Sequence, residues 1–159
     1  GAVPADAASA GYKDIVAAVR EVCDYCKRNG QRFHLETGQE TVDVLLRFIK
    51  DVGRDNLGIN FDPANMILYN NGDPVAALRL IGRRVRGVHL KDALKTKVPG
   101  TWGAEVTVGT GEVNWPAFLA ALAAVGFPGW LCLEREAGTQ RVEDIRTGRL
   151  FVEKLLRGA

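Results

Sequence analysis

Four side chains in this sequence could together hold a metal ion. Glu36, Asp62, His89 and Glu134 each lie at or near the end of a short run of strand length. They are separated by 26, 27 and 45 residues, and the first two spacings each fit one strand, one helix and their connections. The regular spacing predicts that the four belong to successive units of one architecture.

Three carboxylates and one imidazole form a ligand set of hard to borderline donors. Such a set suits one divalent ion, Mn²⁺, Mg²⁺, Co²⁺ or Zn²⁺. An ion of this kind holds adjacent oxygens of a hydroxy-carbonyl compound and acidifies the neighbouring C–H bond. Glu36 and Glu134 could then remove and return a proton as the catalytic pair.

Each of the four residues also has an ordinary structural explanation. An acidic residue that ends a strand often caps the following helix. A single histidine such as His89 can also be a buried residue whose hydrogen bonds are satisfied. The repetition at four strand ends favours a shared site over four separate coincidences.

The elements that must position these residues alternate along the chain. Apolar residues with a period near 3.6 predict helices, and short apolar runs between them predict strands. The expected helices span residues 12–29, 39–52, 73–82, 115–125 and 141–157, and the expected strands span 32–36, 57–61, 85–90 and 130–133. Residues 93–114 are expected to form a long loop that is rich in glycine.

Strands that alternate with helices predict an α/β fold with one parallel sheet in a single domain over residues 1–159. Two architectures fit this order: an open doubly wound sheet, or part of a (β/α)8 barrel. In both, the carboxyl ends of the strands share one edge, where active sites of such folds lie.

Composition excludes several other classes of protein. Charged residues make up 25% of the chain with a net charge of +2, and no run of basic residues stands out, so we expect no nucleic-acid partner. No apolar stretch approaches the roughly 20 residues that span a bilayer, so we expect no membrane partner. Three cysteines, without a secretory leader, favour the cytoplasm.

Five segments resemble a known family. They are HLETGQET (34–41), GINFDPANM (58–66), VHLKDA (88–93), VGTGEVNWPAF (108–118) and LCLEREAG (131–138). Together they resemble the sugar phosphate isomerase/epimerase family of the xylose-isomerase-like TIM barrel superfamily. That superfamily also contains tagatose epimerase, inosose dehydratase and endonuclease IV. The resemblance covers nearly the whole chain.

The resemblance implies a role for particular residues. The four residues of the cluster match the family's metal ligands, and Glu36 and Glu134 match the pair that moves the proton in its epimerases. Lys91 and Asp92 follow the metal histidine, where the family often contacts substrate or orients ligands. Asn65 stands where the epimerases commonly have a histidine, and its amide could bind substrate oxygens but cannot act as an acid or base.

Other motifs have weaker implications. Trp102, in the long loop, either covers the site and touches substrate or anchors the loop. The three cysteines, of which Cys23 and Cys26 form a C-x-x-C motif, are expected in the core. Gly109 to Gly111 are more typical of a turn than of a phosphate cradle. Arg135 and Glu136 either reach substrate or hold the last strand in place.

The resemblance also implies that this chain is the C-terminal half of a TIM barrel, with about four strands and five helices. A complete barrel takes about 250 residues, and the chain has 159. Half a barrel has open strand edges, which favour pairing with another chain. The chain is therefore expected to be a fragment of a longer protein that lacks its N-terminal half, or to complete the barrel as a homo-oligomer or by swapping.

The leading hypothesis for function is a metal-dependent isomerase or epimerase. Its substrate would be a sugar, sugar phosphate or cyclitol, and the reaction would pass through an enediolate. One alternative is a metal-dependent dehydratase or lyase that acts on a keto-cyclitol. Another is a non-catalytic half-barrel that associates with itself. The only histidines are His34 and His89, too few for the multi-zinc site of endonuclease IV.

Overall fold

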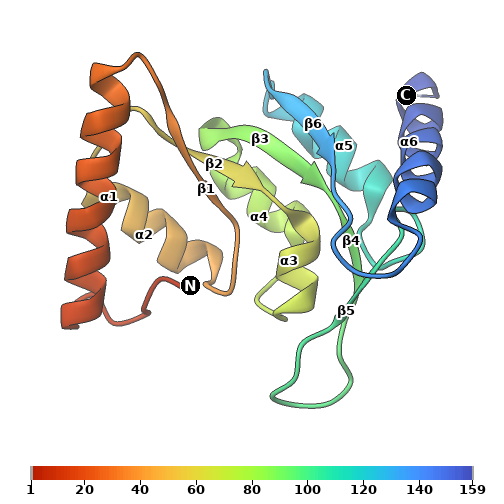
Figure 1. The fold of residues 1–159 in the computed structure, drawn as a ribbon, viewed down its shortest axis with the longest axis horizontal. Coiled ribbons are helices and arrows are strands. Elements are labelled where there is room, and N and C mark those ends of the chain that lie inside the picture. Colours follow the sequence, from red (N-terminus) through yellow and green to blue (C-terminus); the bar gives the residue numbers. More distant parts are fainter. Residues whose placement is uncertain (1, 159) are drawn as a thin grey trace.

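The chain is organised around a four-stranded parallel sheet (Figure 1). The structure is a computed structural model that describes residues 2–158. The strands lie in the order β1 (Phe33–Glu36), β2 (Leu57–Phe61), β3 (Val85–Leu90) and β6 (Trp130–Leu133). Glu36 is paired with Asn60 and His89 with Cys132, so the carboxyl ends of all four strands lie at one edge. The predicted parallel α/β fold is confirmed, and its four strands are consistent with part of a barrel.

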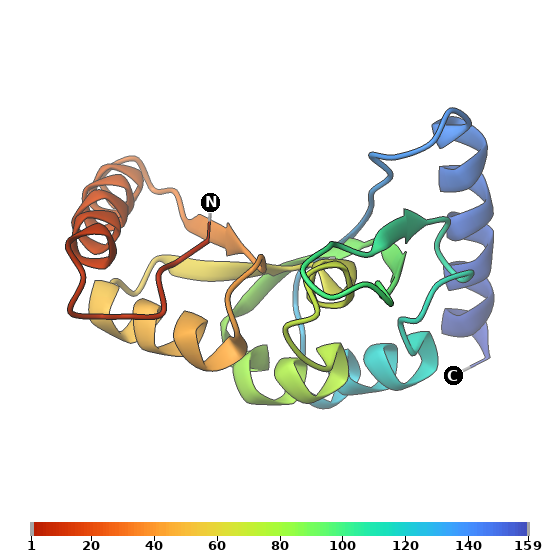
Figure 2. The same ribbon diagram turned by 90° about the horizontal axis from the view of Figure 1, so that it is seen from below.

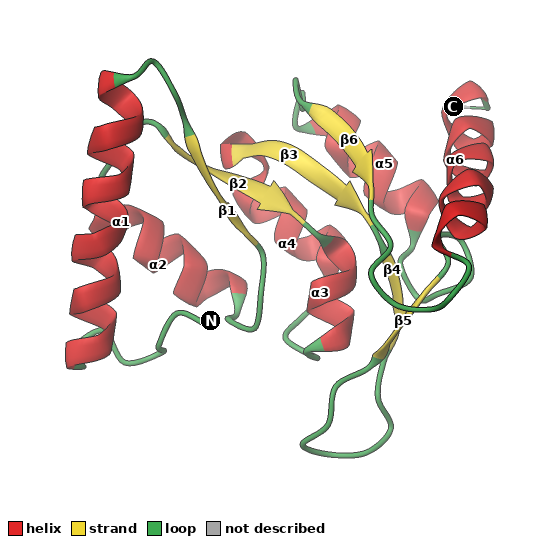
Figure 3. Cartoon of the chain, in the orientation of Figure 1, coloured by secondary structure: helices red, strands yellow, loops and turns green. Residues whose placement is uncertain are grey.

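Six α-helices of residues 2–158 accompany the sheet (Figure 3). They are α1 (Ala10–Arg28), α2 (Val42–Val52), α3 (Pro63–Leu68), α4 (Pro74–Ile81), α5 (Trp115–Ala124) and α6 (Arg141–Arg157). Most of these helices begin at a residue whose side chain caps the first turn. For example, Thr41, Asp73 and Asn114 each accept a hydrogen bond from a backbone N–H in the first turn. Gly53 ends α2 in the left-handed conformation. Within residues 2–158, no helix has both the length and the apolar character needed to cross a bilayer.

Two features were not predicted from the sequence. The six-residue helix α3 begins directly after β2, where Asp62 caps it and Pro63 occupies its first turn. The segment expected as a long loop contains an antiparallel hairpin of β4 (Asp92–Leu94) and β5 (Ala104–Val106). Both elements are shorter than the window over which a hydrophobic period can be recognised.

The core lies on one face of the sheet. Ile59, Phe61 and Val88 point from the strands into it and meet Phe48 of α2 and Phe118 of α5, all of them buried. Figure 2 shows α2, α4 and α5 along this face. Alternation of side chains along each strand then places the intervening residues on the other face.

The opposite face of the sheet carries polar and exposed residues. His89 is half-buried there, while Trp130 is 87% exposed and Cys132 is exposed. The prediction that Cys132 belongs to the core is therefore wrong, because alternation along β6 turns it away from the helices. Cys23 of α1 is fully buried as predicted, and Cys26 is half-buried.

Candidate metal centre

The four predicted ligands converge at the carboxyl edge of the sheet. Glu36 ends β1, Asp62 follows β2, His89 lies near the end of β3 and Glu134 follows β6. One ligand atom from each lies within 4.8 Å of those of the other three. Residues nearly 100 positions apart in sequence thus form one cluster.

Asp62 uses its two carboxylate oxygens differently. Its Oδ1 accepts hydrogen bonds from the backbone N–H groups of Ala64 (2.8 Å) and Asn65 (3.2 Å), and so caps α3. Its backbone is held by Thr37, whose hydroxyl donates to the Asp62 carbonyl and accepts from the Asp62 N–H. Its Oδ2 is buried and has no hydrogen-bond partner among residues 2–158. The residue is therefore a helix cap with one oxygen left over for the cluster.

His89 lies between the two glutamates. Its Nδ1 is 3.1 Å from Oε1 of Glu36 and 2.7 Å from Oε2 of Glu134. Its Nε2 is 2.9 Å from Nδ2 of Asn60 on the neighbouring strand. This contact helps to hold the imidazole in place; when Nδ1 binds a cation, Nε2 carries the ring proton, and the amide would accept it through its oxygen.

The donor set fits a divalent cation. The contact between His89 and Oε2 of Glu134 is close but does not have the geometry of a hydrogen bond. Within residues 2–158, both this oxygen and Oδ2 of Asp62 are therefore buried without a hydrogen-bond partner. Buried carboxylate oxygens without partners are costly unless a proton or a cation satisfies them. Burial raises the pKa of Asp62 from 3.8 to about 7, against the opposing effect of the Lys91 charge. A hard divalent ion would satisfy both oxygens at once.

Lys91 is buried directly beside the cluster. Its Nζ hydrogen-bonds Glu136 and lies 3.8 Å from Oδ2 of Asp62 and 3.7 Å from Oε2 of Glu134. Burial lowers the pKa of Lys91, but the bond to Glu136 and the neighbouring carboxylates outweigh it and raise the pKa to about 12. The ammonium is thus a permanent positive charge that faces the two oxygens without hydrogen-bond partners.

Asn65 also lies at the cluster. Its Nδ2 donates to Oε1 of Glu36 at 3.3 Å and to the Thr37 carbonyl at 3.0 Å. The amide therefore orients the Glu36 carboxylate from the first turn of α3. A substrate contact by Asn65 stays a prediction.

Asp92 does not face the cluster. It is fully buried, and its Oδ2 accepts from the N–H groups of Gly109 (2.9 Å) and Gly111 (3.1 Å) and from Nε1 of Trp115 (2.9 Å). Its Oδ1 accepts from the Val113 N–H at 3.1 Å. A Cβ on Gly111 would collide with this carboxylate, so glycine is required there. The expectation that Asp92 binds substrate is not supported, because its oxygens are used to hold the 109–115 loop.

Two residues that were not predicted help to position the site. Asn60 of β2 contacts His89. It could have been found because it lies two residues before Asp62, the spacing at which side chains of an extended chain point the same way. Glu105 of β5 accepts from Nη1 of Arg135 and from the backbone N–H of Glu136, both at 2.9 Å. Arg135 and Glu105 thus hold the segment after Glu134 in place; no sequence signal links Glu105 to that segment.

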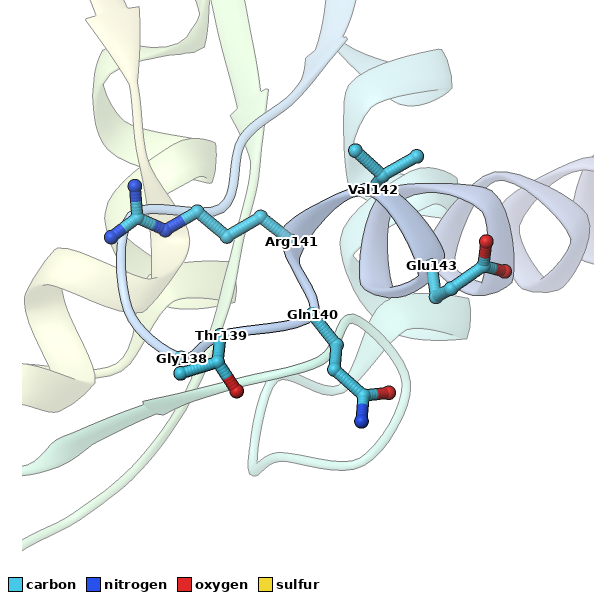
Figure 4. A pocket seen from close by; sticks show the side chains of 6 residues that line it. All are labelled: Gly138, Thr139, Gln140, Arg141, Val142 and Glu143. Carbon is cyan, nitrogen blue, oxygen red and sulfur yellow. The ribbon is translucent and has the colours of Figure 1, made fainter.

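Neither Trp102 nor the hollow in Figure 4 belongs to the cluster. Trp102 lies on the hairpin that joins β4 to β5 and packs against Tyr69. The hollow in Figure 4 has a volume of about 530 Å³ and lies at the start of α6, lined by residues 138–143. It contains none of the four ligands, so its size alone does not make it the functional site.

The fold and the cluster together define a class of protein. The profile of the xylose isomerase-like TIM barrel family matches residues 1–155. The chain therefore belongs to the xylose isomerase-like TIM barrel family. Among curated relatives, it is 32% identical over 113 residues to Escherichia coli protein YihM, covering 70% of this chain and 33% of that protein. It is 21% identical over 150 residues to the inosose dehydratase of Clostridium tetani, and the match covers 84% of this chain and 50% of that protein.

Solved structures agree with this assignment. A xylose isomerase domain protein from Planctomyces limnophilus is 44% identical, with a TM-score of 0.92 over 98% of this chain and 57% of that one. A xylose isomerase-like TIM barrel protein from Mycobacterium smegmatis, in complex with magnesium, is 23% identical with a TM-score of 0.77, covering 98% and 53%. An L-ribulose 3-epimerase is 21% identical with a TM-score of 0.74, covering 98% and 59%. The chain thus spans one third to somewhat over half of the length of these relatives.

Proposed function

We propose that this chain carries the metal-binding and proton-transfer half of an isomerase or epimerase. The substrate is a sugar, sugar phosphate or cyclitol with a hydroxyl beside a carbonyl. The observation that carries the proposal is the convergence of Glu36, Asp62, His89 and Glu134 within 4.8 Å. Among the relatives, a magnesium-bound protein and an epimerase have the same fold and support this class of reaction.

The four residues of the cluster would hold one divalent ion, Mn²⁺, Mg²⁺, Co²⁺ or Zn²⁺. When bound, the ion supplies Lewis-acid polarisation of the substrate carbonyl, which lowers the pKa of the adjacent C–H. Asn60 orients His89, and Asn65 orients Glu36. Lys91 keeps a positive charge beside Asp62, which opposes the effect of burial on the pKa of that carboxyl.

Glu36 and Glu134 are the proton carriers in this proposal. Glu36 ends β1 and Glu134 follows β6, the two outer strands of the sheet, and so they flank Asp62 and His89 from opposite sides. One glutamate removes the proton from the carbon next to the carbonyl, which leaves an enediolate. The other returns a proton to the same carbon for epimerisation, or to its neighbour for isomerisation.

The test is turnover of keto-sugars in deuterated water. Wild-type protein is expected to incorporate solvent deuterium at the carbon next to the carbonyl. Glu134→Gln is expected to lose this activity by at least about 100-fold, since the amide cannot carry the proton. Glu112→Gln, an exposed glutamate in the 109–115 loop, is the matched control. Wild-type rates in Glu134→Gln would contradict the assignment.

A metal-dependent keto-cyclitol dehydratase is the second candidate, because several curated relatives are inosose dehydratases. The first proton transfer is the same in both reactions. In a dehydratase, hydroxide then leaves from the adjacent carbon, and the product is unsaturated. Ultraviolet absorption of a conjugated product with loss of water would favour the dehydratase, and an epimeric sugar of unchanged mass would favour the epimerase.

A further inference from the structure

An aromatic pair lies outside the metal cluster and has no role in the proposed proton transfer. Tyr69 follows α3, and Trp102 lies on the hairpin between β4 and β5. Their ring centroids are 5.2 Å apart in an edge-to-face arrangement. Trp102 is nevertheless 65% exposed, so most of its surface is free to meet a ligand.

The hairpin holds Trp102 in a fixed place. The N–H of Gly103 donates to the Leu68 carbonyl at 2.9 Å, which ties the hairpin to the end of α3. A Cβ on Gly103 would collide with the Leu94 carbonyl, so this close approach requires glycine. Across the hairpin, the hydroxyls of Thr96 and Thr101 are 2.7 Å apart. Trp102 is therefore presented by a hydrogen-bonded turn that packs on α3.

The aromatic pair forms one wall of a hollow of about 400 Å³. The other lining residues are mainly polar and include Asn70, Thr96 and Lys97. Amide, hydroxyl and ammonium groups beside an aromatic face can bind both the hydroxyls and the apolar C–H face of a sugar ring.

Tyr69 links this hollow to the residues of the metal cluster, because it also lines a neighbouring hollow. A second hollow of about 200 Å³ is lined by Tyr69 together with Glu36, Thr37 and Asn65. Tyr69 therefore lines both the hollow that includes Glu36 and the hollow that includes Trp102. A ligand that spans both hollows would place one end at Glu36 and the other on Trp102.

We propose that the Tyr69–Trp102 hollow is an outer subsite for a second sugar ring. The substrate is then a glycoside or disaccharide, with its reacting ring at the metal cluster and its other ring on Trp102. The polar lining favours a sugar over the apolar side chains of a second copy of this chain. The inference rests on the proposed function for the reacting ring, but the outer subsite can be tested without turnover.

The experiment compares the binding of one sugar ring with that of two. Glucose, cellobiose and maltose are titrated by calorimetry into the magnesium-loaded protein, and saturation-transfer NMR identifies the ring that contacts the protein. We expect at least one disaccharide to bind about tenfold more tightly than glucose, the gain of a stacked ring. Trp102→Ala should remove this gain. Trp102→Phe should retain most of the gain in affinity, because it keeps an aromatic face. Trp130→Ala, the control that removes another exposed tryptophan, should retain it as well.

The outcomes separate this inference from the proposed function. Equal binding of glucose and the disaccharides, or a preference that survives Trp102→Ala, would overturn the outer subsite. If the protein then still held magnesium and converted a monosaccharide, the proposed function would stand alone. A Trp102-dependent preference in a protein that holds no metal would support the subsite and contradict the proposed function. A dimer that is lost in Trp102→Ala, without any preference for disaccharides, would overturn the inference in favour of a second copy.

Discussion

At the scale of single residues, Asp62 joins two roles that the sequence leaves as alternatives. Its Oδ1 caps α3 and its Oδ2 faces the other ligands. Because the capped oxygen fixes the side chain, the second oxygen is held in place before any metal arrives. One carboxylate therefore caps a helix and offers a fixed oxygen to the cluster.

The raised pKa of Asp62 makes metal binding depend on pH. Its pKa is about 7, so below pH 7 the metal-free site holds a proton there that the ion must displace. We expect the affinity for Mg²⁺ or Mn²⁺ to fall by up to roughly tenfold per pH unit as the pH decreases below 7. Calorimetric titrations between pH 5.5 and 8 measure this. An affinity that is constant over the range would contradict an ionised Asp62 as a ligand.

Lys91 is expected to stabilise the metal-free site. Lys91→Met removes the charge that faces Asp62 and Glu134, and should lower the free energy of unfolding by about 3 kcal/mol, as expected when a buried ion pair loses one partner. A bound divalent ion restores positive charge, so added metal should raise the melting temperature more in Lys91→Met than in wild type. Thermal unfolding with and without Mg²⁺ measures both effects; equal shifts in the two proteins would contradict this role.

At the scale of elements, the loop after the hairpin is organised by one carboxylate. Asp92 accepts hydrogen bonds from Gly109, Gly111, Val113 and Trp115. A glycine-containing turn that could have held a phosphate instead wraps around a side chain of the same protein. Its role is to fix the loop that leads into α5.

Loss of the Asp92 carboxylate should lower the free energy of unfolding. Asp92→Ala leaves several buried donors without an acceptor, and we expect the free energy of unfolding to fall by at least about 3 kcal/mol. Asp73→Ala is the control, since Asp73 caps α4 through one exposed hydrogen bond and its loss should cost about 1 kcal/mol. Urea denaturation of both variants measures the difference. Similar small losses in the two would show that the loop does not depend on Asp92.

The strands and long helices were predictable because their periods and caps are local signals. Strands 57–61, 85–90 and 130–133 have the predicted bounds. The hairpin and α3 were not predictable, because a hydrophobic period cannot be recognised over three to six residues. At the candidate site, the four clustered residues could be found from their repeated place at strand ends. Glu105 could not, because its partner Arg135 is 30 residues away and only the fold brings them together.

At the scale of the whole molecule, one face and two edges of the sheet remain open within residues 2–158. In the described chain, β1 pairs only with β2, and β6 pairs only with β3. Trp130 is 87% exposed on β6. Open strand edges and an exposed aromatic residue favour association with a further set of strands.

We therefore expect this chain, prepared alone, to self-associate. Trp130→Lys should shift the equilibrium toward the monomer, because it places a charge on the open edge strand. Light scattering coupled to size-exclusion chromatography measures the mass. A folded wild-type monomer at all concentrations would contradict this expectation.

The metal content of the purified chain tests the central claim most directly. After incubation with Mn²⁺ or Mg²⁺ at pH 8 and removal of free metal, we expect about one ion per chain in wild type, as one four-ligand cluster implies. Glu36→Gln should lose this ion, and Glu112→Gln should keep it. A folded wild-type protein that holds no metal, or a Glu36→Gln protein that holds as much as wild type, would contradict the metal centre.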